Sequence, residues 1–312
     1  MKTSILIIWI VSCCLLHQTA LAQRKLRKIV AETQTITIHV EQLRKKKGGN
    51  KLHLNQTKDK PKQVNYLLLL GVSQYINWSS LNTPKKDAQD LKQILITKYG
   101  FDENDVFELY DEQFTKPNLI GKIDEINSLT RDFGEGHDNL IIFYSGHGYL
   151  GNHSQRGYWV PASAQEDQVE AYIPIYKIKQ YIKEFSNIKH IFVIVDACFS
   201  GAFFTNDVAK DAAQTPKYPK SRWVLTSSNI NKANDGKRGE NSPFMKVLLK
   251  HLREYQGASL NIEHLIDQVK NEDRDQTGYK GQRLLGVGDE GGIFLLKNHQ
   301  TNPKTNQAGN RD

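Results

Sequence analysis

Two glycine-rich segments of the sequence contain residue types that suit nucleophilic catalysis. The segment 145–148 reads Ser-Gly-His-Gly and contains His147, and the segment 196–201 reads Asp-Ala-Cys-Phe-Ser-Gly and contains Cys198. A thiolate is a strong nucleophile, and a neighbouring imidazole helps to generate it and can then protonate a leaving amine. The two segments therefore predict a catalytic pair of His147 and Cys198, provided that the fold brings them into one cleft.

The glycines beside the histidine have a predicted role of their own. Gly146 and Gly148 permit a tight backbone path and the close approach of a substrate. The backbone N–H groups of Gly148 and Cys198 are predicted to point at a developing oxyanion, where loss of one donor typically costs about 3 kcal/mol of transition-state stabilisation. Taken singly, such a histidine is more often a surface residue and such a cysteine a core residue, so it is their joint occurrence that favours catalysis.

Apolar runs alternate with amphipathic segments between residues 65 and 298, which predicts one α/β domain with a largely parallel sheet. The predicted strands are 66–72, 106–110, 139–144, 191–195, 223–226 and 292–296. The predicted helices are one that Pro84 opens and Gly100 ends, and the segments 117–130, 174–185, 242–255 and 261–269. In the second helix, Ile120, Ile123 and Ile126 are predicted to face inward.

The order of these elements places both glycine-rich segments at strand ends. The predicted strands 139–144 and 191–195 run into the segments of His147 and Cys198, respectively. Ligands of open α/β sheets bind at the carboxyl ends of the strands. If the two strands are neighbours, the imidazole and the thiol face each other across one cleft.

The N-terminal residues 1–22 have the pattern of a secretory signal peptide. Lys2 gives a charged start, residues 5–16 are apolar, and Ala20-Leu21-Ala22 offers small residues for cleavage. A retained membrane anchor and lipidation at Cys13 are the alternatives, although the apolar run is short for a bilayer span. The predicted location is therefore secreted or periplasmic.

Cysteine usage adds to the case for a reactive thiol. The chain has three cysteines, Cys13, Cys14 and Cys198, and the first two lie in the predicted signal peptide. The processed chain would keep Cys198 alone and would form no internal disulfide, although its compartment would allow one. A lone cysteine in an exported protein is either a buried filler or a reactive thiol.

Charge is concentrated in the segment 23–64, which carries 12 Lys or Arg and 3 Asp or Glu. This segment is predicted to be a basic arm or pro-segment, or else a solvated linker, and its charge would allow contact with a membrane or wall polymer. Residues 65–312 are close to neutral, which argues against nucleic-acid binding.

The last segment, 299–312, is a polar tail. With 38% hydrophobic and 24% charged residues, the chain of 312 residues is not a collagen, a coiled coil or wholly disordered.

The segments 145–148 and 196–201 resemble the His and Cys motifs of the caspase superfamily (peptidase family C14). They are most similar to the motifs of metacaspases, paracaspases and bacterial caspase-like peptidases, and the resemblance covers about residues 65–298. It implies the caspase-like (caspase–hemoglobinase) fold, with a six-stranded, mostly parallel sheet flanked by helices on both faces. It also implies a cysteine endopeptidase acting on proteins or peptides, with His147 and Cys198 as its dyad.

The resemblance also implies a preference for basic residues. In the metacaspase-like branch an acidic pocket selects Arg or Lys, and Asp87 and Asp196 match the positions of its carboxylates. Two carboxylates in a partly desolvated pocket would bind a guanidinium or ammonium group by charge-assisted hydrogen bonds. Otherwise, Asp87 is a favourable charge in the first turn of a helix and Asp196 a turn residue at a strand end. True caspases cleave after Asp and use arginine side chains in the pocket. No arginine of this sequence matches those positions.

The sequence departs from the metacaspase pattern at two places. Phe199 stands where many metacaspases carry His, which leaves the subgroup open. Metacaspases often need calcium, but Glu166, Asp167 and Glu170 do not match their ligand pattern. No metal or other cofactor is therefore predicted, and these acids are otherwise explained as a solvated loop.

The loop 203–222 is a predicted site of self-cleavage, because caspases are often cut in this region and the loop carries Lys210, Lys217, Lys220 and Arg222. A plain surface loop is the alternative.

Two other functions stay open for the whole domain. One is a catalytically silent, caspase-like binding module. The other is a legumain-like or gingipain-like peptidase of the same fold, although legumain-like enzymes usually carry Glu before the motif cysteine.

Overall fold

The computed structural model describes most of the predicted domain. The described residues are 63–130, 137–151, 156–204, 219–228, 235–273 and 278–300. The predicted signal peptide, nearly all of the basic arm, most of the loop 203–222 and most of the polar tail lie outside them.

The chain comprises two compact units, one of residues 63–124 and 132–312, the other of residues 1–62 and 125–131. Every strand among the described residues belongs to the first unit.

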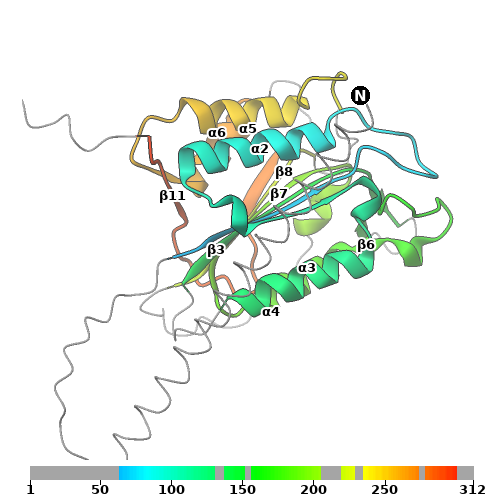
Figure 1. Ribbon diagram of the computed structural model, residues 1–312, viewed down its shortest axis with the longest axis horizontal. Coiled ribbons are helices and arrows are strands. Elements are labelled where there is room, and N and C mark those ends of the chain that lie inside the picture. Colours follow the sequence, from blue (N-terminus) through cyan, green and yellow to red (C-terminus); the bar gives the residue numbers. More distant parts are fainter. Residues whose placement is uncertain are drawn as a thin grey trace, which may run out of the picture. The chain divides into compact units, whose positions relative to one another are not determined.

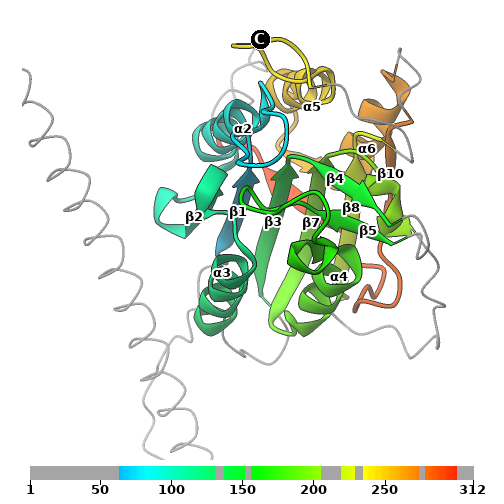
Figure 2. The same cartoon turned by 90° about the vertical axis from the view of Figure 1, so that its right-hand side faces the viewer.

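A six-stranded sheet forms the centre of the first unit (Figures 1 and 2), in the order β10-β8-β7-β3-β1-β2. Its strands are β1 (Asn65–Gly71), β2 (Val106–Tyr110), β3 (Asp138–Ser145), β7 (Ile188–Asp196), β8 (Ser221–Thr226) and β10 (Lys280–Arg283). All neighbours pair in parallel except β10, which is antiparallel to β8. The predicted mostly parallel sheet of six strands is confirmed.

Helices lie on both faces of this sheet (Figure 1). One face is covered by α2, α5 and α6, and the other by α4 and the first part of α3. Their bounds are α2 (Pro84–Tyr99), α3 (Lys116–Leu129), α4 (Ile175–Glu184), α5 (Pro243–Glu254) and α6 (Ile262–Asn271). The apolar runs of the strands follow from this arrangement, because a parallel sheet covered on both faces exposes neither of them to water. Leu67, Leu69 and Phe143, for example, are fully buried in one cluster with residues of α2, α5 and α6.

The ends of the helices follow local rules of the sequence. Pro84 occupies the first turn of α2, where its missing N–H costs nothing. Gly100 ends that helix with a φ of 68°, a left-handed conformation that glycine adopts without strain. Ser242 caps α5 by accepting a hydrogen bond from the N–H of Met245 at 3.0 Å.

Two predictions about these elements are wrong. The last predicted strand, 292–296, is not part of the central sheet, since β11 (Leu295–Lys297) pairs only with the short β9 (Ser259–Asn261). The sixth strand is instead β10, whose sequence Lys-Gly-Gln-Arg has no apolar pattern because it lies at the sheet edge. Ile120 of α3 is exposed, and Leu119 faces inward in its place.

A small sheet that the sequence did not predict follows β3 directly. It contains β4 (Gly148–Leu150), β5 (Gly157–Trp159) and β6 (Ile173–Pro174), and it is visible beside the C-terminal ends of the central strands in Figure 2. Short 3-10 helices complete the described structure at Glu103–Asp105, Asp111–Gln113, Val169–Ala171 and Ser200–Phe204.

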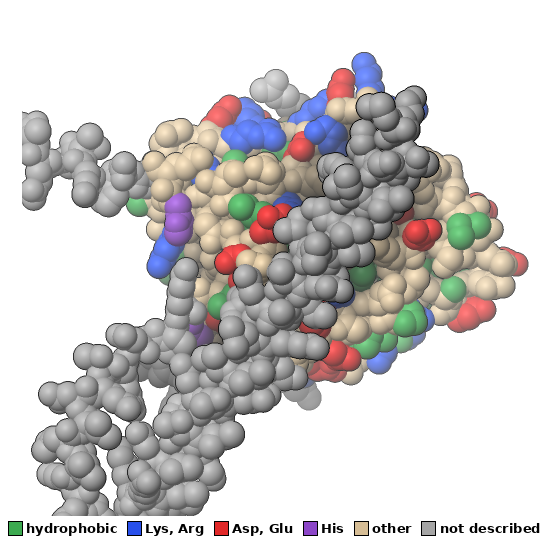
Figure 3. Space-filling model, viewed as in Figure 1, with side chains coloured by type: hydrophobic (Ala, Val, Ile, Leu, Met, Phe, Trp, Pro, Cys, Tyr) green, Lys and Arg blue, Asp and Glu red, His purple; other side chains and the backbone are tan. Residues whose placement is uncertain are grey.

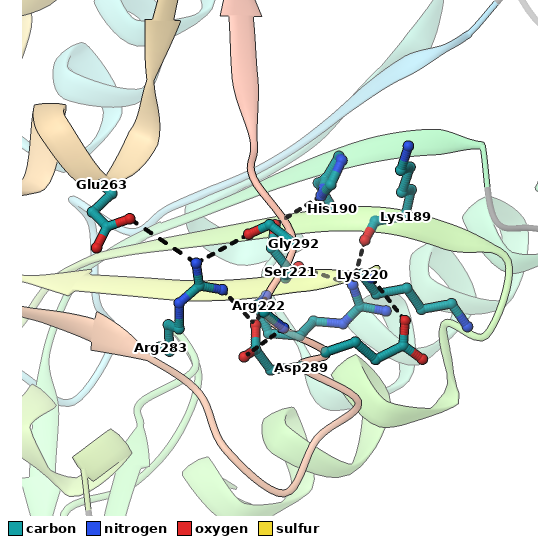
Figure 4. Close-up of polar contacts among 11 residues, drawn as sticks. Lys189, His190, Lys220, Ser221, Arg222, Glu263, Arg283, Asp289 and Gly292 are labelled. Carbon is teal, nitrogen blue, oxygen red and sulfur yellow. Dashed lines mark hydrogen bonds and ion pairs between the residues drawn. The ribbon is translucent and has the colours of Figure 1, made fainter. Parts of the chain in front are cut away.

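The start of β8 is held by the segment that follows β10 (Figure 4). Arg222 is 1% exposed, and its guanidinium donates to the carbonyl oxygens of Lys189 at 2.9 Å and Ile188 at 2.9 Å. Its backbone N–H donates to Asp289 at 2.8 Å. Arg222 is therefore inaccessible to a protease, and the prediction that it is a self-cleavage site is wrong. Lys210 and Lys217 lie outside the described residues.

None of the helices in the described ranges is long and apolar enough to cross a bilayer. Acidic and basic side chains are intermixed over the face shown in Figure 3.

Candidate active site

The central sheet brings the two glycine-rich segments together. β3 and β7 are parallel neighbours, and Ser145 at the end of one is paired with Asp196 at the end of the other. His147 and Cys198 each lie two residues beyond these paired positions, so both side chains leave the sheet at the same edge. They line one cleft of about 500 Å³. Both residues of the predicted pair therefore lie in this one cleft.

Gly148 is the point at which the two segments touch. A Cβ atom at this position would lie 1.9 Å from the carbonyl oxygen of Cys198, far inside van der Waals contact. The same Cβ would lie 3.3 Å from the backbone nitrogen of Cys198. The backbones of Gly148 and Cys198 therefore meet at one place, as the predicted oxyanion hole requires, and only glycine fits there.

We expect Gly148→Ala to lower kcat/KM for peptide cleavage by about a hundredfold, because displacement of a catalytic segment by about 1 Å has an effect of this size. Steady-state kinetics with purified protein would measure the change. Gly121→Ala is the matched control, since a Cβ there meets no atom within 4 Å. An active Gly148→Ala variant would show that the two segments need not touch.

The imidazole of His147 is oriented by a backbone carbonyl group. Its Nε2 atom lies 2.7 Å from the carbonyl oxygen of Ser79. A carbonyl oxygen only accepts, so Nε2 carries the hydrogen in the neutral ring, and Nδ1 is the nitrogen that can accept a proton. The Ser79 carbonyl group therefore fixes the tautomer of the imidazole.

Aromatic side chains hold the backbone and ring of His147. The Tyr75 hydroxyl accepts a hydrogen bond from the N–H of His147 at 2.7 Å, and the Tyr144 hydroxyl donates to its carbonyl oxygen at 2.7 Å. The rings of Tyr75 and Trp78 lie with their centroids 4.6 and 5.2 Å from the imidazole. Burial lowers the pKa of His147, which favours the neutral imidazole that a general base must be.

The turn that presents Cys198 is strained. Phe199 has a φ of 56°, a left-handed conformation that a bulky side chain rarely adopts. The buried Ser200 secures the next position, because its hydroxyl donates to the carbonyl oxygen of Ser228 at 2.8 Å. Such strain is concentrated at functional sites, where surrounding structure maintains it.

The two predicted pocket aspartates lie together, but at different depths. Asp196 lines the cleft and accepts a hydrogen bond from the Ser242 hydroxyl at 2.5 Å. Asp87 is 0% exposed, is not among the residues lining the cleft, and accepts from Asn241 Nδ2 at 2.8 Å and from the N–H of Ser242 at 3.2 Å. Ser242 thus bridges the two carboxylates, with Asp87 behind Asp196.

Burial strongly affects the ionisation of both aspartates. It raises the pKa of Asp196 to about 6. It also raises the pKa of Asp87 to about 7, with the charge of Asp196 adding to the effect. A cation entering the cleft would be stabilised by the ionised forms and would favour the loss of these protons.

Three contributors to the cleft were missed from the sequence. Asp235 lines it and accepts from the N–H groups of Asn82 at 2.7 Å and Thr83 at 3.2 Å. Glu166, which the sequence assigned to a solvated loop, also lines it. Ser79 acts through a backbone atom. The only signal for Asp235 was its Asn-Asp-Gly turn, which predicts a turn rather than a site.

The lining of the cleft is acidic. Asp196, Asp235 and Glu166 contribute carboxylates, and no Lys or Arg lines it among the residues that the structure describes. Carboxylates without cations of the protein beside them favour a positively charged ligand.

Comparison with known proteins decides the family. Residues 65–283 match the caspase domain family (Peptidase_C14). The chain belongs to the caspase family. The chain is 27% identical over 166 residues to metacaspase-1 of Plasmodium falciparum (isolate 3D7), an alignment that covers 50% of this chain and 26% of that protein. The chain thus spans about a quarter of the length of this metacaspase.

Solved structures agree on the caspase fold. Protein GSU0716 from Geobacter sulfurreducens is 16% identical, with a TM-score of 0.51 over 70% of this chain and 93% of that one. Caspase-1 from Spodoptera frugiperda is 14% identical, with a TM-score of 0.51 over 74% of this chain and 92% of that one. The predicted family and fold class are confirmed. The roles assigned to His147, Cys198, Gly148, Asp87 and Asp196 stay predictions.

Proposed function

We propose that this caspase-family protein is a cysteine endopeptidase that cleaves proteins or peptides after Lys or Arg. Cys198 is the nucleophile and His147 the general base. One observation carries the proposal: the imidazole and the thiol share a cleft whose charged lining residues are the carboxylates of Asp196, Asp235 and Glu166.

The proposed reaction follows from the orientation of His147. Nδ1 takes the proton of the Cys198 thiol, and the thiolate attacks the carbonyl carbon of the scissile amide. The backbone N–H groups of Gly148 and Cys198 stabilise the resulting oxyanion. The imidazolium then gives its proton to the leaving amine, and the C–N bond breaks to leave a thioester. A water molecule, deprotonated by His147, hydrolyses the thioester and restores the thiol.

Selection of a basic residue follows from the acids at the end of β7. The residue whose carbonyl is attacked places its side chain beside the cysteine turn, where Asp196 lies two positions before the nucleophile. Asp196 would contact the cation directly, and Asp87 would act from behind through Ser242. A neutral side chain of similar length would leave these groups without a counter-charge.

Four peptides that differ only in Asn, Arg, Lys or Asp before the scissile bond test the proposal. The wild type should cleave the Arg and Lys peptides and leave the Asp peptide intact, and Cys198→Ala should cleave none. The proposal includes self-cleavage in the basic arm or in the loop 203–222. Intact mass spectra of the same incubations would detect it.

Other outcomes of this panel distinguish the alternatives. Preferred cleavage after Asn would favour a legumain-like peptidase. Absence of any cleavage, together with absence of thiol labelling, would favour a catalytically silent binding module.

A further inference from the structure

The cleft extends from His147 onto an aromatic wall that the proposed mechanism leaves unused. Trp78 and Tyr149 both line the cleft. The Trp78 ring, whose centroid lies 5.2 Å from the imidazole, is next to the catalytic base itself. Tyr149 follows Gly148 in β4, so it starts from the backbone of the predicted oxyanion hole.

One buried residue holds this wall together. Tyr172 is 0% exposed, and its ring meets those of Trp78 and Tyr149 edge-on at centroid distances of 6.0 and 5.2 Å. Its hydroxyl donates to the carbonyl oxygens of Gln165 and Glu166, each at 2.9 Å. The two rings and the backbone of Glu166 are therefore fixed relative to one another, and the exposed Glu166 lines the same cleft.

The chemistry of the reaction says which part of a substrate meets the wall. The imidazole that takes the thiol proton also protonates the leaving amine, so the residue that carries this amine must lie beside His147. Asp196 lies instead beside the cysteine turn, where the side chain before the scissile bond would bind. The Trp78 ring lies next to the imidazole, and Glu166 lines the same cleft as His147, which places both beside the leaving group.

We propose that Trp78, Tyr149 and Glu166 form a subsite for the residue that follows the scissile bond, and that this subsite selects Lys or Arg. The inference rests on the proposed function and narrows its substrate class to pairs of basic residues. Aromatic faces attract cations, and a nearby carboxylate adds a counter-charge. The basic arm of this chain contains such pairs in the run Arg44-Lys45-Lys46-Lys47.

Two peptides that differ at one position test the inference. Both carry Arg before the scissile bond, and the next residue is Lys in one and Gln in the other. The wild type should show a kcat/KM for the Lys peptide that is about tenfold higher. Glu166→Gln should reduce this ratio to about threefold or less. Asp167→Asn, which removes the neighbouring acid that does not line the cleft, should leave the ratio unchanged.

The results of this experiment separate the inference from the proposed function on which it rests. A wild-type ratio near one would overturn the inference alone, because cleavage after Arg would still occur. An unchanged ratio in both Glu166→Gln and Tyr149→Leu would show that the wall does not make the selection. Absence of thiol-dependent cleavage of either peptide would overturn the proposed function and the inference together.

Discussion

His147→Ala is expected to lower kcat/KM for peptides cleaved after Arg by about 10²- to 10⁴-fold, a range typical of the loss of a general base. The variant lacks the group that deprotonates Cys198 and the group that protonates the leaving amine. Because the two residues act as a unit, His147→Ala combined with Cys198→Ala should lose no more activity than the more damaging single change. Steady-state kinetics on the purified variants would measure these effects.

A second histidine offers a matched control for this prediction. His137 lies just before β3, at the opposite end of the strand that leads to His147. His137→Ala should therefore retain wild-type kcat/KM. An equal loss in both variants would mean that His147→Ala acts through the fold, and a fully active His147→Ala would remove the imidazole from the mechanism.

Asp196→Asn is expected to lower kcat/KM for Arg and Lys peptides by about a hundredfold, because a buried charge pair that loses one partner typically costs about 3 kcal/mol or more. The Asn side chain keeps the size of Asp and can still accept the hydrogen bond of the Ser242 hydroxyl. A peptide with Gln before the scissile bond is the control, and its slow cleavage should be unaffected. An equal loss on the Gln peptide would show that Asp196 supports the fold rather than the specificity.

The ionisation of the pocket acids makes the effect of Asp196 depend on pH. With the pKa of Asp196 at about 6 and that of Asp87 at about 7, both acids gain charge as the pH rises through this range. The kcat/KM for Arg peptides should therefore rise between about pH 5.5 and 7.5. The rate at which neutral iodoacetamide alkylates Cys198 would be measured over the same pH range. This reagent does not occupy the pocket, so dividing by its rate removes the part of the pH dependence that comes from the thiol and the imidazole. The rise that persists after this correction should be smaller in Asp196→Asn, where only Asp87 still titrates in the pocket.

The sequence predicted the centre of the fold because burial leaves a clear pattern there. The apolar runs of β1, β3 and β7 are covered on both faces, and Pro84 and Gly100 mark the two ends of α2. The shared edge of His147 and Cys198 followed from the rule that parallel strands present their carboxyl ends together. The match of the caspase family and the pairing of β3 with β7 agree with this prediction.

The parts that escaped prediction depend on long-range contacts. β10 is a polar edge strand, so no apolar periodicity marks it. Ser79 orients the imidazole through a backbone oxygen, and any residue type has such an oxygen. Asp235 reaches the cleft only because its carboxylate binds the backbone of Asn82 and Thr83, which lie more than 150 residues earlier in the chain. The depth of Asp87 likewise depends on Asn241 and Ser242, far along the sequence from α2.

Covalent labelling tests the central claim most directly, because it needs no knowledge of the natural substrate. Two peptidyl acyloxymethyl ketones, one ending in Arg and one in Asp, would be incubated with the full chain, and the adducts located by peptide mass mapping. The Arg probe should modify Cys198 once and rapidly, the Asp probe far more slowly, and His147→Ala should suppress the reaction. Faster labelling by the Asp probe, or an Arg adduct at any residue other than Cys198, would contradict the account.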